Sequence, residues 1–189
     1  MQNTHLSTQN NKENKKPFIS VQELVIFALL GTIMFISDQL MEFLPNIHIL
    51  GLLIITYTLI FRVKAVIPIY VYVFLSGVFA GFAFWWIPYL YVWTVLWAVT
   101  LLLPKNLVNK KTGYIVYPAV CFLHQLSFGI LYAPNDALFL NLRGDALLGW
   151  IIMGTTFNIV PALANMLLGL FTIRLTKLLK KVLKTANKK

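Results

Sequence analysis

Two carboxylates and three aromatic side chains stand out in this sequence as groups that can recognise a ligand. Asp38 and Glu42 are four residues apart, so on a helix they lie on one face. Trp85, Trp86 and Tyr89 follow one another closely further along the chain. Carboxylates near aromatic rings attract a cationic or amine-bearing ligand through charge and cation–π contact. The pattern predicts a binding site for such a ligand.

Three further polar residues, His124, Gln125 and Asn158, are expected at a similar depth in the chain's apolar segments. Polar groups inside a membrane are costly and usually face a cavity or one another, so all three are candidate ligand contacts. Structural alternatives stand beside this interpretation. His124 and Gln125 can form hydrogen bonds between helices, Asn158 can satisfy backbone groups freed by Pro161, and Glu42 can be solvated at the membrane surface.

The sequence contains no motif for catalysis or for metal binding. It lacks a glycine-rich nucleotide-binding loop, an HExxH pattern and a Gly-x-Ser-x-Gly elbow. Cys121 is the single cysteine, and the three histidines do not have the spacing of a metal site. We therefore expect a protein that is not an enzyme and that needs no metal or cofactor.

The elements that must position these residues are apolar helices. The chain has 189 residues, of which 59% are hydrophobic and 12% charged, whereas soluble domains are about one quarter charged. Roughly 20 apolar residues span a bilayer, and six apolar stretches occur, at about residues 21–44, 47–61, 65–84, 86–103, 114–133 and 146–173. These stretches predict an all-α integral membrane bundle of six transmembrane helices.

The distribution of basic residues predicts the orientation of this bundle. In a six-span arrangement, fifteen of the sixteen Lys and Arg residues fall on one side, and only Arg143 falls on the other. Basic loops stay cytoplasmic, so both termini are expected in the cytoplasm of a multi-pass protein of the cell membrane. An Arg143 folded inward as part of a lid would favour a ligand carboxylate instead of a cation.

Three segments are expected along the chain: a disordered cytoplasmic arm at residues 1–17, a six-helix substrate-binding domain at 18–180, and a basic cytoplasmic tail at 181–189. The net charge of +10 is concentrated at the ends of apolar stretches. This placement favours anionic lipid as the partner of the basic tail and argues against nucleic acid.

Small residues in the first apolar stretch, at Ala28, Gly31 and Thr32, predict a groove that lets another helix approach closely. The partner helix can belong to this chain or to a separate membrane subunit.

With six spans, both ends inside, a small-residue groove and a polar pocket near the outer face, the chain resembles the substrate-binding S components of energy-coupling factor (ECF) transporters, which import vitamins. In that family an Ala-x-x-x-Ala stretch docks on the transmembrane T subunit; here Ala28-x-x-x-Thr32 stands in its place, with threonine replacing the second alanine. The resemblance implies a T subunit, two cytoplasmic ATPases and a small water-soluble ligand. It also implies that the S component topples in the membrane to deliver that ligand.

Two other functions are compatible with the residues themselves. A stand-alone facilitator or proton-coupled carrier would use Asp38 and Glu42 as titrating groups. An integral membrane enzyme acting on lipid would use His124 as a base, but no nucleophile or metal set accompanies it.

Overall fold

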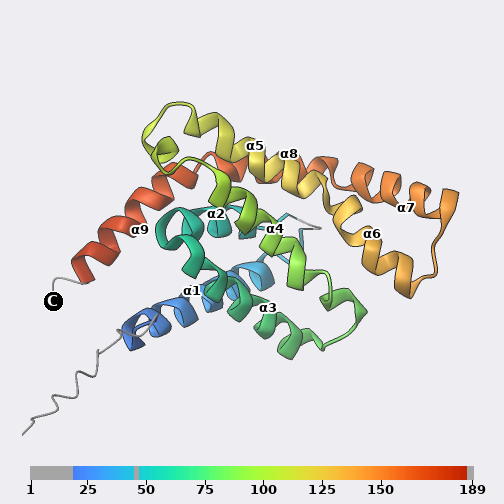
Figure 1. Ribbon diagram of the computed structural model, residues 1–189, viewed down its shortest axis with the longest axis horizontal. Coiled ribbons are helices and arrows are strands. Elements are labelled where there is room, and N and C mark those ends of the chain that lie inside the picture. The colour runs from blue at the N-terminus through green and yellow to red at the C-terminus, as the bar shows by residue number, and fades with distance from the viewer. Residues whose placement is uncertain (1–18, 45–46, 187–189) are drawn as a thin grey trace, which may run out of the picture.

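The computed structural model describes residues 19–44 and 47–186, and within these ranges the regular elements are all helices (Figure 1). The expected arm at residues 1–17 and the end of the expected tail lie outside the described residues. The described α-helices are α1 Val21–Leu40, α2 Leu50–Phe61, α3 Val66–Ala80, α4 Tyr89–Leu102, α5 Gly113–Leu126, α6 Phe128–Phe139, α7 Gly144–Phe157, α8 Ile159–Gly169 and α9 Thr172–Ala186. Short 3₁₀ helices occur at η1 Arg62–Ala65, η2 Phe84–Trp86 and η3 Lys105–Asn109.

Several of these helices are long and apolar enough to cross a membrane. Four helical stretches qualify: Val21–Leu40, Leu50–Ala80, Phe84–Leu102 and Gly113–Phe139. α7 and α8 qualify only as a pair bent by 44°, which gives up to five candidate spans. The expected all-helical, multi-pass membrane protein is therefore confirmed. The number of candidate spans is four or five rather than six, because residues 50–80 form one helical run.

The short helix α2 lies at the centre of the molecule. Nine of its twelve residues are buried, as expected for a helix that is apolar on all sides. It packs against α4, α8 and α9. At its end, Arg62 adopts a φ of 55°, and its guanidinium donates a 2.6 Å hydrogen bond to the carbonyl of Leu101 in α4. The indole of Trp97 donates to the Arg62 carbonyl at 3.2 Å, so α4 holds this turn from both directions.

Glycine permits the closest helix crossings. α1 packs along α3 at Gly31, where an added Cβ would lie 2.6 Å from the side chain of Val71. α5 runs beside α8 (Figure 1), and an added Cβ on Gly169 would lie 2.8 Å from Pro118 Cα. α6 and α7 cross where Gly154 approaches Gly129. Such contacts are the usual means of helix association in membranes, where helices gain little from the hydrophobic effect.

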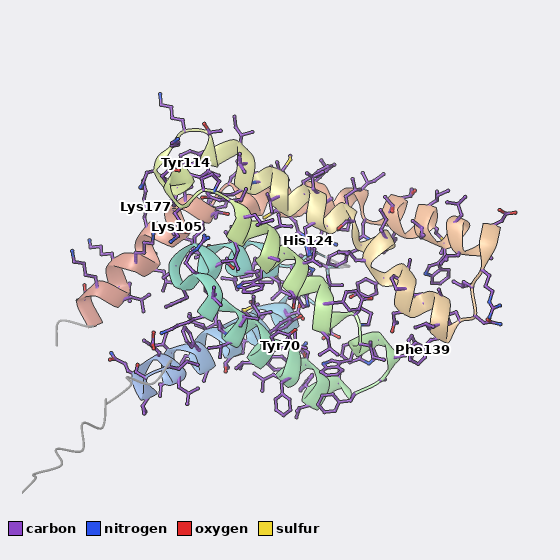
Figure 2. All side chains as sticks on the ribbon, viewed as in Figure 1. Tyr70, Lys105, Tyr114, His124, Phe139 and Lys177 are labelled. Carbon is purple, nitrogen blue, oxygen red and sulfur yellow. The ribbon has the colours of Figure 1, made fainter. Side chains whose placement is uncertain are left out.

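Two lysines that are distant in the sequence lie at the same end of the molecule. Figure 2 shows Lys105 and Lys177 at one end and Phe139 towards the other. α1 begins with a capping box, in which Ser20 and Glu23 exchange hydrogen bonds. The carboxylate of Glu23 also forms a 2.6 Å ion pair with Lys64 of η1, which joins the start of α1 to the turn after α2.

Candidate ligand-binding site

A cavity of about 340 Å³ lies between the end of α1, the residues that lead into α2, the end of α3 and the start of α4. Ligand sites for small organic molecules typically measure about 300–1,000 Å³. The cavity brings together four residues that the sequence selects as ligand contacts, Asp38, Glu42, Trp85 and Tyr89. Its other lining residues are Gln39, Met41, Leu44, Ile47, His48, Ser76 and Ala80.

The acidic wall of this cavity comes from the end of α1. Oδ2 of Asp38 accepts a 2.9 Å hydrogen bond from the hydroxyl of Tyr72, a fully buried residue of α3. Glu42 lies just after the helix. It lines the cavity, as expected for a ligand contact, and it is also exposed, as expected for a solvated carboxylate. Among the described residues the lining includes neither Lys nor Arg, and Arg143, which precedes α7, is exposed and lies outside this lining. The lining therefore favours a ligand that carries a positive charge.

The aromatic wall comes from η2 and the first turn of α4. The rings of Trp85 and Tyr89 meet edge to face with centroids 5.5 Å apart. Tyr89 stacks on Tyr72 at 6.2 Å and contacts Trp93 at 5.8 Å. These neighbours hold the Tyr89 ring in place beside the acidic wall, which is the arrangement that cation–π recognition requires.

His48 is a lining residue that we did not select from the sequence. It precedes α2, and its ring meets Trp93 edge to face at 5.3 Å. Its Nδ1 is buried and has no hydrogen-bond partner among the described residues. Burial, and secondarily the proximity of His124, lowers the pKa of His48 to about 4, so the imidazole is neutral at pH 7. Its shared depth with Asp38 was the sequence signal that could have identified it.

Two other predicted contacts lie outside this cavity. The indole of Trp86 turns towards α3, where it donates a 2.7 Å hydrogen bond to the Val73 carbonyl. His124 is buried between helices, with Nε2 3.0 Å from the carbonyl oxygen of Val92 and its ring against Trp93. Both residues therefore join helices to one another in the described structure.

Gln125 and Asn158 belong to a buried polar network that also includes Asn165. The Gln125 side-chain amide donates to Asn158 Oδ1 at 2.7 Å, and Asn165 donates to Gln125 Oε1 at 2.9 Å. Asn158 also donates to the Gly154 carbonyl at the bend between α7 and α8. This arrangement matches the structural alternative for Gln125. The hydrogen bond from Asn158 goes to the carbonyl of Gly154 and not to that of Phe157, which is the group that Pro161 frees. Asn158 additionally lines a second cavity of about 200 Å³ near Asp136 and Trp150.

The small-residue groove of α1 divides between two faces. Ala28 is exposed and Thr32 is half-buried, and the Thr32 hydroxyl donates a 2.9 Å hydrogen bond to the Ala28 carbonyl. Gly31, three residues after Ala28, is buried against Val71 and Pro68 of α3. Gly31 thus packs inside this chain, and only Ala28 and Thr32 remain available to a separate subunit.

Within the described residues, no group of three or more His, Cys, Asp or Glu side chains is placed to hold a metal ion. The fold and the cavity together define a multi-pass helical membrane protein with an acidic and aromatic cavity. No family model matches the chain, and comparisons with curated proteins and with solved structures also find no match.

Proposed function

We propose that this chain is the substrate-binding S component of an ECF-type importer, and that it binds a vitamin or a similar water-soluble nutrient. The observation that carries this proposal is the 340 Å³ cavity, whose lining joins Asp38 and Glu42 to Trp85 and Tyr89. A cavity of this size suits a small organic nutrient. Energy for uptake comes from two cytoplasmic ATPases coupled through a transmembrane T subunit.

The lining supports one class of ligand. Two carboxylates, with no Lys or Arg among the described lining residues, favour a ligand that carries an amine or another positive group. The Trp85 and Tyr89 rings favour a flat ring system in the ligand, because aromatic faces stack on rings and attract cations. The neutral imidazole of His48 adds no competing positive charge at pH 7.

The proposed topology has six crossings, with both termini in the cytoplasm and the cavity near the outer face. In this proposal the chain reverses direction at Arg62, where φ is 55°, so that residues 50–80 make two crossings. The short central α2 then accounts for one crossing, in a place where neighbouring helices shield it from lipid. The common location of Lys105 and Lys177 at one end supports a cytoplasmic assignment for that end (Figure 2).

The exposed face of α1 around Ala28 is the proposed docking surface for the T subunit. Ala28 is small and exposed, and Thr32 lies one turn further on. A neighbouring helix can therefore approach the α1 backbone closely at this point. Docking there leaves the cavity at the other end of α1 free to hold ligand.

Mass spectrometry of small molecules released from the purified protein tests this function. We expect a retained aromatic, amine-bearing nutrient that is lost from an Asp38→Asn variant and kept by an Asp136→Asn control, since Asp136 lines the other cavity. Uptake in reconstituted vesicles should require the T subunit, the ATPases and ATP. Uptake by this chain alone, driven by a proton gradient, would identify a secondary carrier instead.

A further inference from the structure

The last helix, α9, is amphipathic and is only partly covered by the rest of the protein. Its fifteen residues span about 22 Å at 1.5 Å per residue, which is shorter than the ~30 Å hydrocarbon core of a bilayer. It is not among the candidate membrane spans. Its first turns pack on α2, with Thr172, Ile173 and Thr176 buried. Beyond them the helix leaves the bundle towards the end where α1 begins (Figure 1).

The two long faces of α9 differ sharply in chemistry. Leu175, Leu178, Leu179 and Val182 recur at the three- and four-residue spacing that places them on one side of a helix. Leu175 and Leu179 pack partly against the core. The same stripe continues outward with Leu178 60% and Val182 55% exposed. An apolar stripe that continues past the protein it packs on needs another apolar environment.

The opposite face of α9 is basic. The helix carries no acidic residue, and its five basic residues are all exposed: Arg174, Lys177, Lys180, Lys181 and Lys184. Lys105 lies at the same end of the molecule as Lys177 (Figure 2). A helix with Leu and Val on one side and Lys on the other complements a surface of acyl chains bordered by anionic phosphates.

We infer that α9 lies in the plane of the membrane, within the anionic headgroup layer at the basic end of the protein. Leu178 and Val182 enter the acyl boundary, and the basic face contacts lipid phosphates. Because the start of α9 packs on the buried helix α2, the same lipid contact holds α2 at a fixed depth. This inference does not depend on the proposed transport function.

Spin-label accessibility in nanodiscs tests the position of α9. The full-length chain would carry a Cys121→Ala substitution and a single new cysteine, and one protein per disc excludes a second copy as the covering partner. A label at Val182 should collide with dissolved oxygen and be shielded from a water-soluble nickel complex. A label at Lys181 should be accessible to the nickel complex and collide less with oxygen. A label at Lys110, in the α4–α5 connection, is the control for full exposure to water.

A second experiment tests how nickel access at position 182 depends on lipid charge and on the basic residues of α9. In discs containing phosphatidylglycerol, Lys177→Gln with Lys184→Gln should raise nickel access at position 182 several-fold, because each basic residue near an anionic surface changes affinity about fivefold. The matched pair Lys110→Gln with Lys111→Gln should leave it unchanged. Nickel access at 182 equal to that at 110 would overturn the inference. Shielding of position 182 from both reagents would also overturn it, because protein would then cover this face. If discs made only of zwitterionic lipid gave the same accessibilities, the inferred contact with anionic phosphates would be wrong.

Discussion

The hydroxyl of Tyr72 donates a 2.9 Å hydrogen bond to Oδ2 of Asp38, which ties α3 to α1 at the acidic wall of the cavity. Tyr72 is fully buried and stacks on Tyr89. The carboxylate and the aromatic wall are therefore linked through one side chain, and Tyr72 is expected to position both for a ligand.

Removing the charge of Asp38 should weaken ligand binding more than removing the hydrogen bond that positions it. We expect Asp38→Asn to cost about 1–3 kcal/mol of binding free energy, the range for a hydrogen-bonding group that loses its partner, and Tyr72→Phe to cost about 0.5–1.5 kcal/mol. Isothermal titration calorimetry with the retained ligand measures both. A Tyr72→Phe loss larger than that of Asp38→Asn would place the ligand's main contact elsewhere.

Trp85 and Trp86 provide a matched pair, since they are adjacent in sequence but only Trp85 lines the cavity. Trp85→Leu should reduce ligand affinity by about 0.5–2 kcal/mol through loss of cation–π contact and leave the melting temperature nearly unchanged. Trp86→Leu loses the hydrogen bond to Val73 and should lower the melting temperature while affinity is kept. Reversal of the two results would mean that the ligand lies against α3.

Substitutions at Gly31 and Ala28 should distinguish an effect on protein stability from an effect on coupling to the T subunit. An added Cβ on Gly31 would lie 2.6 Å from Val71 and 2.8 Å from the Pro68 carbonyl, so Gly31→Ala should destabilise the protein by roughly 1–3 kcal/mol. The side chain at position 28 is exposed, so Ala28→Leu should leave stability and ligand binding intact. It should abolish ATP-driven uptake. Full uptake by the Ala28→Leu protein would exclude this face as the docking surface.

His48 should make stability depend on pH in a defined window. Because burial lowers its folded-state pKa to about 4 from an ordinary value of about 6.5, the unfolded chain binds a proton first as the pH falls. The stabilising contribution is complete above about pH 6.5, declines between pH 6.5 and 4, and changes no further below, with a total of no more than about 3 kcal/mol.

A His48→Gln protein should lose that part of the pH dependence. Thermal unfolding of both proteins in nanodiscs between pH 8 and 4 measures the difference. Parallel curves would show that His48 is solvated in the folded protein.

Residue types and depth predicted part of the site. Asp38, Glu42, Trp85 and Tyr89 line one cavity because the ends of α1 and α3 and the start of α4 meet at one level. Depth alone does not fix the direction in which a side chain points around its helix. That is why Trp86 and Gln125 turn to neighbouring helices instead.

The helical membrane fold was predictable from apolar length, but the arrangement of the second stretch was not. Hydropathy identifies α2 as apolar without showing that it is twelve residues long and buried by α4, α8 and α9. The small residues of α1 likewise predicted a close contact without showing that Gly31 faces α3 and Ala28 faces outward.

Titration of the intrinsic tryptophan fluorescence with a panel of vitamins and purine-like compounds tests the central claim most directly. The panel should contain cationic, neutral and anionic ring compounds, and it should be measured on the native chain and on the Asp38→Asn and Asp136→Asn variants. We predict saturable quenching by an amine-bearing aromatic compound, weakened by Asp38→Asn and unchanged by Asp136→Asn. Tight binding of a purely anionic compound, unaffected by Asp38→Asn, would contradict the account and direct attention to Arg143.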